Sequence, residues 1–152
     1  LHAVNDLFIG PRSHVSARYT IEMDGRREAH SSSGIIVSTG MGSTGWFRSL
    51  LTGALAMAGP ASSEELKLLQ HAGFPWESNH LYFTVREPFP SRSSQAELVF
   101  GRIERGTSLQ LTSAMPDYGV IFSDGVESDF LEFNSGIRAD VGISPRSGTL
   151  VL

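Results

Sequence analysis

The chain of 152 residues contains no cysteine, which excludes disulfide bonds and thiolate metal sites. Lysine is nearly absent, because Lys67 is the only lysine among 12 basic residues. A GC-rich gene produces the same excess of arginine, so that excess alone indicates no ligand. The formal net charge of −4 argues against a general nucleic-acid-binding protein, since such binding depends on neutralising phosphates.

No apolar run reaches the length of a membrane span, and no secretion signal is recognisable. We therefore predict a protein that binds neither membranes nor nucleic acid. Its predicted location is the cytoplasm, or the mitochondrial matrix if the source is eukaryotic. The five histidines show no His-x-x-x-His spacing, so no zinc-type metal site is predicted. A Gly-x-Ser-x-Gly elbow is also missing, which leaves a serine-hydrolase triad without support.

The length suits a single domain with its own hydrophobic core, and we assign residues 1–152 to it. Short apolar runs separated by turn residues predict strands over most of the chain. The predicted strands are residues 4–9, 16–23, 26–31, 35–37, 80–85, 97–103, 108–112, 118–123, 130–133, 137–143 and 149–152. Asp24-Gly25 predicts a type I′ hairpin turn, which requires a positive φ at both central positions.

Two helices are predicted between the fourth and fifth strands. Apolar residues recur at steps of three and four from Phe47 to Ala58, and Gly59-Pro60 ends this helix. The sequence Ser-Ser-Glu-Glu at 62–65 matches a capping box and predicts a second helix that ends at Gly73. Many short strands with two helices inserted once predict a mainly β fold, a β-sandwich, rather than a parallel α/β sheet.

The most informative stretch joins the fourth strand to the first helix. It carries Gly40, Gly42 and Gly45, with Ser43 and Thr44 before the last of them. Ser43 or Thr44 is predicted to cap the helix, because a side-chain oxygen there accepts an N–H that the first turn leaves unpaired. A strand, a glycine turn and a helix start bring several backbone N–H groups to the positive end of a helix dipole. This arrangement suits a phosphate or a ribose.

Three interpretations of this loop compete. Its spelling matches the dinucleotide fingerprint Gly-x-Gly-x-x-Gly, but a second helix follows where that motif needs a parallel strand. A Walker A loop fails because Trp46 and Phe47 stand where Lys and Ser or Thr are required. The glycines also fit a tight strand-to-helix turn that binds nothing.

Four short motifs stand out in chain order. They are Asn5-Asp6, Ser33-Gly34 with the glycine loop up to Trp46, Arg86-Glu87-Pro88, and Asp124-Gly125. Taken singly, the third fits an exposed ion pair before a turn, and the fourth fits a hairpin tip. Taken together, they resemble the C-terminal domain of NAD kinases over essentially the whole chain. The mitochondrial-type branch is most similar, because its loop has the sequence Thr-Gly-x-Gly-Ser and it has a similar Arg-Glu-Pro.

The resemblance implies a two-domain enzyme that phosphorylates the 2′-hydroxyl of the adenosine ribose of NAD to give NADP. The implied phosphoryl donor is ATP or polyphosphate with Mg²⁺. In this family the proposed general base belongs to a Gly-Gly-Asp-Gly motif of an N-terminal α/β domain, and that motif is missing from this sequence. We therefore expect this chain to be the NAD-binding and homodimerising half, inactive alone, with the catalytic base outside it.

The resemblance also implies a set of binding residues. They are Asn5, Asp6, Gly40, Gly42, Ser43, Thr44, Gly45, Trp46 and Ser49, with Ser33 and Asp124 as secondary candidates. Asn5 would hydrogen-bond the adenosine part of the dinucleotide, and Asp6 stands where the family usually has Glu. Trp46 replaces the usual Tyr, which keeps an aromatic wall but loses the hydroxyl. Ser33 stands where many relatives carry an aspartate that reaches across the dimer.

Two alternatives stay open. A related diacylglycerol-type lipid kinase or sugar kinase shares the two-domain plan, and the upstream sequence would distinguish it. A nucleotide-binding β-sandwich that never catalyses would lack the acidic motif in its full-length gene.

Overall fold

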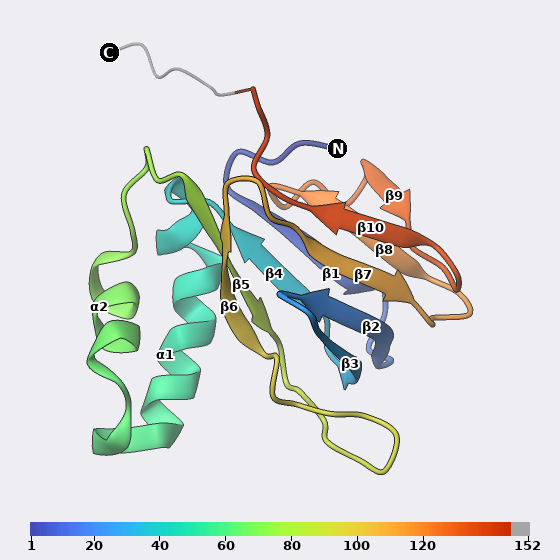
Figure 1. The fold of residues 1–152 in the computed structure, drawn as a ribbon, viewed down its shortest axis with the longest axis horizontal. Coiled ribbons are helices and arrows are strands. Elements are labelled where there is room, and N and C mark those ends of the chain that lie inside the picture. The colour runs from blue at the N-terminus through green and yellow to red at the C-terminus, as the bar shows by residue number, and fades with distance from the viewer. Residues whose placement is uncertain (147–152) are drawn as a thin grey trace.

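The computed structural model describes residues 1–146 as two antiparallel β-sheets packed face to face, with two helices against one of them (Figure 1). The first sheet has six strands in the order β6-β5-β4-β1-β8-β9, and the second has four in the order β10-β7-β2-β3. The predicted mainly β sandwich with two inserted helices is therefore confirmed. No helix within residues 1–146 is long and apolar enough to cross a membrane.

The strands are β1 (Asp6–Pro11), β2 (Ala17–Met23), β3 (Arg26–Ser32), β4 (Ile35–Ser38), β5 (His80–Val85), β6 (Phe100–Glu104), β7 (Leu109–Ser113), β8 (Gly119–Ser123), β9 (Phe130–Glu132) and β10 (Arg138–Val141). The helices are α1 (Trp46–Ala58) and α2 (Glu64–Ala72), with short 3-10 turns η1 (Met41–Thr44) and η2 (Gly59–Ala61). The strand predicted at 149–152 lies outside the described residues.

Two predicted strand starts are wrong, for a shared reason. The strand predicted from residue 97 begins at Phe100, because the N–H groups of Glu97 and Leu98 donate to the carboxylate of Glu28 at 3.2 and 2.9 Å. The strand predicted from residue 4 begins at Asp6 and continues through Pro11. In both places the backbone N–H groups donate to a side-chain carboxylate, Glu28 in the first case and Asp124 in the second. The carbonyl groups of a neighbouring strand would otherwise accept them.

The core between the sheets follows from the alternation of side chains along each strand. Ile9, Ile35 and Val37 of the six-stranded sheet are buried in one cluster with Ile21 and Leu111 of the four-stranded sheet. Each large apolar side chain removed from water there contributes roughly 1.5 to 3 kcal/mol. This burial fixes the strand register, because a slip of one residue would turn the same side chains outward.

The helices cover the outer face of the six-stranded sheet beside β4, β5 and β6 (Figure 1). Phe47 and Leu51 of α1 are buried against Leu69 of α2 and Tyr82 of β5. The predicted capping at the start of α2 is confirmed in part, since the hydroxyl of Ser63 accepts an N–H of the first turn. This packing holds the start of α1 close to the end of β4.

The predicted cap of α1 by Ser43 or Thr44 is wrong. Gly45 is the N-cap residue, and no side chain makes the capping hydrogen bond. Residues 41–44 form η1 instead, and the Ser43 hydroxyl donates to the Gly40 carbonyl at 2.6 Å while it accepts the Phe74 N–H at 3.2 Å. Ser43 is therefore a buried structural link between the loop and the end of α2.

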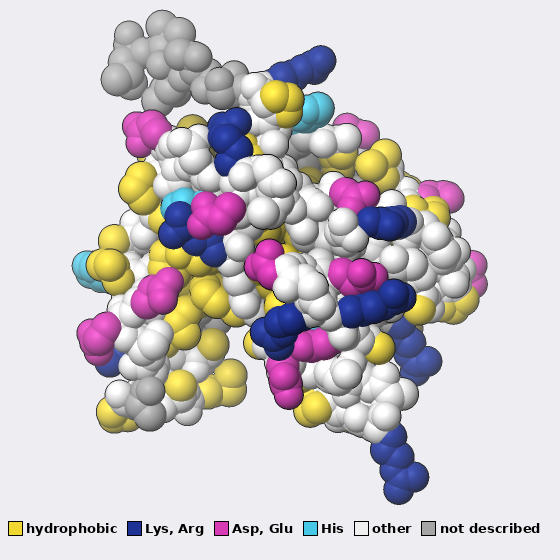
Figure 2. Space-filling model, viewed as in Figure 1, with side chains coloured by type: hydrophobic (Ala, Val, Ile, Leu, Met, Phe, Trp, Pro, Cys, Tyr) yellow, Lys and Arg dark blue, Asp and Glu magenta, His cyan; other side chains and the backbone are white. Residues whose placement is uncertain are grey.

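Charges of both signs are mixed on the surface. Figure 2 shows acidic and basic side chains close together over the sandwich, without a continuous basic band on the described part of that face. Ion pairs join Arg27 to Glu22 at 3.4 Å and Lys67 to Glu64 at 2.6 Å. These pairs are exposed, so each contributes at most about 1 kcal/mol to stability.

Candidate functional site

The site is positioned by the antiparallel neighbours of β1. Asp6 at the start of β1 pairs with Ser38 at the end of β4, and Leu7 pairs with Ser123 at the end of β8. The segment before β1, the loop after β4 and the turn after β8 must therefore meet at one edge of the sheet. Three of the four motifs found in the sequence lie in these segments.

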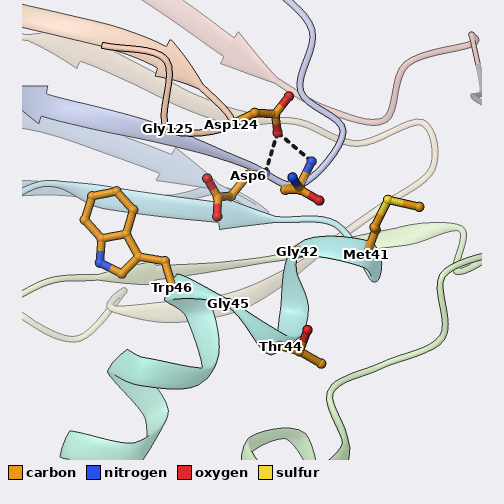
Figure 3. A pocket seen from close by; sticks show the side chains of 9 residues that line it. Asp6, Met41, Gly42, Thr44, Gly45, Trp46, Asp124 and Gly125 are labelled. Atoms are coloured by element: carbon orange, nitrogen blue, oxygen red, sulfur yellow. Dashed lines mark hydrogen bonds between the residues drawn. The ribbon is translucent and has the colours of Figure 1, made fainter.

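A cavity of about 400 Å³ lies at this meeting point (Figure 3). A volume of this size is typical of small-molecule sites. In Figure 3 the carboxylate of Asp6 extends from β1 toward the side of the cavity that Trp46 forms. The lining residues are Asn5, Asp6, Met41, Gly42, Thr44, Gly45, Trp46, Asp124 and Gly125.

Asp124 holds the segment before β1 in place. It lies in a turn in which Asp124 and Gly125 have φ values of 54° and 74°, as a type I′ turn requires. Its carboxylate accepts the backbone N–H groups of Val4 at 3.0 Å, Asn5 at 2.6 Å and Asp6 at 3.2 Å. These bonds explain why β1 begins at Asp6, and they fix the position of Asn5 beside the cavity.

The glycine loop packs directly against backbone. A Cβ atom on Gly42 would lie 2.1 Å from the carbonyl oxygen of Asn5, and one on Gly40 would lie 2.0 Å from that of Pro75. Only glycine allows such close approach of two chains. The tight-turn interpretation of these glycines is therefore correct for the loop's shape, and the cavity lies beside this turn.

The expectation that the loop's backbone N–H groups converge on a ligand is wrong for three of them. The Gly42 N–H donates to the Thr39 hydroxyl at 3.2 Å, the Ser43 N–H to the Gly40 carbonyl at 3.3 Å, and the Gly45 N–H to the Gly42 carbonyl at 2.9 Å. The loop uses these groups internally because it folds as a 3-10 turn. These three N–H groups are therefore not available to a ligand in the cavity.

The structure gathers most of the predicted residues but not all of them. Those that line the cavity are Asn5, Asp6, Gly42, Thr44, Gly45, Trp46 and Asp124. Gly40 and Ser43 are buried behind the lining, and Ser49 is exposed on α1 outside it. Ser33 lies between β3 and β4, where its hydroxyl donates to the Glu87 carboxylate.

Two lining residues were not singled out from the sequence. Met41 stands between two predicted glycines, and Gly125 follows the predicted Asp124. Both are adjacent in sequence to predicted site residues, and this adjacency could have indicated that they line the site. Met41 adds a flexible apolar side chain, which adapts to irregular ligand surfaces.

The wall formed by Trp46 is fixed by stacking. Its ring lies parallel to that of Phe8, with centroids 5.5 Å apart and an interplanar angle of 4°. The guanidinium carbon of Arg86 lies 5.1 Å from the centre of the same ring. Trp46 therefore presents a rigid aromatic surface at one side of the cavity.

The lining is acidic. It contains the carboxylates of Asp6 and Asp124 and no Lys, Arg or His. Burial, and secondly the charge of Asp124, raise the pKa of Asp6 above its ordinary value of 3.8. Such a lining suits hydrogen-bond donors such as hydroxyl and amino groups, and it repels phosphates. Within residues 1–146, no three His, Cys, Asp or Glu side chains gather in a way that could hold a metal ion.

Comparisons with solved structures identify the fold. The chain is similar to an NAD kinase from Archaeoglobus fulgidus solved in complex with ATP, with a TM-score of 0.58, 15% identity, and coverage of 91% of this chain and 45% of that one. It is also similar to yeast NADH kinase complexed with NADH, with a TM-score of 0.54, 17% identity, and coverage of 90% of this chain and 33% of that one. No protein-family model and no curated protein matches the sequence.

The likeness establishes a class of fold, an NAD kinase-like β-sandwich, and confirms that prediction. The identity is low in both comparisons, so the shared architecture is what they establish. The chain spans less than half the length of these two kinases.

Proposed function

We propose that this chain is the NAD-binding domain of an NAD kinase-like enzyme that phosphorylates the adenosine ribose 2′-hydroxyl of NAD to give NADP. The observation that carries the proposal is the cavity that brings Asn5, Asp6 and Trp46 together at the meeting point of three family-like motifs. The fold supports it, because two solved structures of this architecture are an NAD kinase with ATP and an NADH kinase with NADH.

The side chains suit a nucleoside. The amide of Asn5 offers one acceptor and two donors, as discrimination of an adenine edge requires. Its backbone is held by Asp124 on one side and by the Thr39 N–H on the other, at 2.6 and 2.9 Å, so the side chain has a defined origin. The carboxylate of Asp6 accepts ribose hydroxyls, and Trp46 provides a flat apolar wall. The polar side chains of the lining suit a nucleoside better than the apolar acyl chains of a diacylglycerol.

Catalysis by this chain alone is not part of the proposal. Phosphoryl transfer needs an in-line nucleophile and concentrated positive charge or metal, and this sequence has no Gly-Gly-Asp-Gly motif. We propose that the complete enzyme supplies the general base and uses ATP or polyphosphate with Mg²⁺. The homodimer through the β-rich domain remains a prediction.

A kinase assay tests the proposal. The 152-residue chain and the complete enzyme are each incubated with Mg²⁺, ATP or polyphosphate, and NAD, NADH or a diacylglycerol. We expect NADP from the complete enzyme and no turnover from the chain alone. Turnover by the chain alone would overturn the division of the site between two domains. Phosphorylation of diacylglycerol in place of NAD would establish the lipid-kinase alternative, and NAD binding without turnover by the complete enzyme would establish the non-catalytic one.

A further inference from the structure

Arg86 follows β5 and carries a charge that no carboxylate among residues 1–146 neutralises at ion-pair distance. Its N–H donates to the Gly34 carbonyl at 2.8 Å and its carbonyl accepts the Ser33 N–H at 2.9 Å, so its backbone extends the strand pairing. No Asp or Glu oxygen in the described part of the chain lies within 4.0 Å of its guanidinium. Its Nε is buried without a hydrogen-bond partner. Buried polar groups are normally paired, so this chain satisfies the Arg86 guanidinium incompletely.

The neighbouring Glu87 is engaged elsewhere, so the ion pair that the sequence suggested is not formed. Glu87 has a φ of 47°, and its carboxylate accepts a hydrogen bond from the Ser33 hydroxyl. Arg86 reaches the same segment through one long hydrogen bond, from Nη1 to the Ser33 carbonyl at 3.4 Å. Its positive charge therefore remains available to an external anion.

Aromatic rings hold the guanidinium next to the cavity. Its central carbon lies 5.1 Å from the centre of the Trp46 ring and 5.9 Å from that of Phe8. Contact with aromatic faces orients the guanidinium plane and leaves N–H groups at its edge free to donate. Trp46 also lines the cavity, so a single indole ring joins the cavity to this cation.

The charges around Trp46 differ in sign, since the Arg86 guanidinium lies over its ring and two carboxylates line the cavity beside it. The cavity contains two carboxylates and no base, so it does not suit a pyrophosphate. We propose that Arg86 binds the pyrophosphate of the dinucleotide by charge-assisted hydrogen bonds while the cavity holds the adenosine. This inference rests on the proposed function, and it makes Arg86 the residue that selects a phosphorylated ligand over a free nucleoside.

Calorimetric titrations of the 152-residue chain with NAD and with adenosine test this assignment. Arg86→Met keeps the side-chain stem that packs on Trp46 and removes the charge. We expect it to weaken NAD binding about tenfold or more, since hydrogen bonds to charged groups are the strong ones, and to leave adenosine binding unchanged. Arg86→Lys should restore part of the NAD affinity, because it keeps the charge without the planar fork. Arg18→Met, on the exposed side of β2, is the matched control and should change neither.

The outcomes separate this inference from the function on which it rests. Retained adenosine binding in Arg86→Met shows that the cavity is intact, and selective loss of NAD affinity supports the assignment. Equal weakening of both ligands would mean that Arg86 only positions Trp46, and would overturn it. Unchanged NAD affinity would also overturn the assignment, and would mean that another group, such as a carboxylate of a second copy, pairs with Arg86. If the unmodified chain bound neither ligand, the proposed function would fail together with this inference.

Discussion

Two Asp-Gly turns of this molecule have nearly the same backbone and different surroundings. Asp24 and Gly25 have φ values of 51° and 76°, and Asp124 and Gly125 have values of 54° and 74°. Asp24 is exposed where β2 turns directly into β3. Asp124 is partly buried after β8, and its carboxylate accepts three backbone N–H groups from the segment before β1.

The comparison shows that the Asp-Gly dipeptide determines the turn conformation. The residues that lie near the aspartate in space determine what its carboxylate binds. Positive φ at both positions follows from the residue types alone. The anchoring role of Asp124 follows from the sheet order. Strand β8 is antiparallel to β1, so the end of β8 lies beside the start of β1. The same order places the glycine loop across the cavity from this turn.

The largest effect is expected on the loop that faces the Asp124 turn. Gly42→Ala should lower the free energy of unfolding by about 3 kcal/mol, because its Cβ would meet backbone atoms that cannot move independently. Gly53→Ala, at an exposed position in α1 with open space around its Cβ, should stabilise the protein by about 0.5 to 1 kcal/mol. Chemical denaturation measures both. Equal effects of the two variants would contradict the close packing beside the cavity.

The comparison between the two turns is tested directly by removing each aspartate. Glycine keeps the positive φ in both variants, so Asp124→Gly and Asp24→Gly differ mainly in the hydrogen bonds that the lost carboxylate had accepted. Asp124→Gly should cost about 2 kcal/mol, since hydrogen bonds to a charged acceptor are lost. Asp24→Gly should change the stability by less than about 0.5 kcal/mol. If urea denaturation gave the same loss for both, Asp124 would be no more than another turn residue.

A smaller effect is expected at the residue that Asp124 positions. Asn5→Ala should raise the Michaelis constant of the complete enzyme for NAD several-fold, since one lost hydrogen bond to a neutral partner corresponds to about 0.5 to 1.5 kcal/mol. Asn79→Ala, which does not line the cavity, serves as the control. Initial rates at varied NAD concentration measure the constant. An unchanged constant would remove Asn5 from the site.

The smallest effect concerns the pH dependence of stability. Burial, followed by the charge of Asp124, raises the pKa of Asp6 above 3.8, so the folded state keeps this proton to a higher pH than the unfolded state does. The folded protein therefore loses stability as the pH rises from 3.8 through the raised pKa of Asp6. Asp6→Asn should remove this decline, whereas Asp24→Asn should leave it in place. Denaturation at pH 4 and pH 7 compares the variants, and identical pH profiles for all three proteins would contradict the raised pKa.

The sequence predicted most strands and turns well because alternation, Asp-Gly pairs and the capping sequence before α2 are local signals. It failed where distant groups compete for backbone N–H donors. Asp124 shortens β1 at its start, and Glu28 delays β6. Burial would raise the pKa of Glu28, but hydrogen bonds from His30 and from two backbone N–H groups hold it at about 2.

The same limit applies to the site. The motifs named most of the lining, because residues such as Asn5 and Trp46 lie within recognisable patterns. They did not indicate that the loop's N–H groups bond internally, since that depends on the 3-10 geometry of η1. The motifs also did not indicate that Arg86 and Glu87 form no ion pair. The Glu87 carboxylate accepts a hydrogen bond from the hydroxyl of Ser33, which is distant in sequence.

The fluorescence of Trp46 tests most directly whether the cavity binds a nucleotide. The chain has two tryptophans, and the other, Trp76, is exposed outside the lining, so Trp76→Phe leaves Trp46 as the only reporter. Titration of this variant with NAD should give a saturable change in indole emission, shifted to higher NAD concentration when Asn5→Ala is added. A response that never saturates, or one that Asn5→Ala leaves unaltered, would contradict the account.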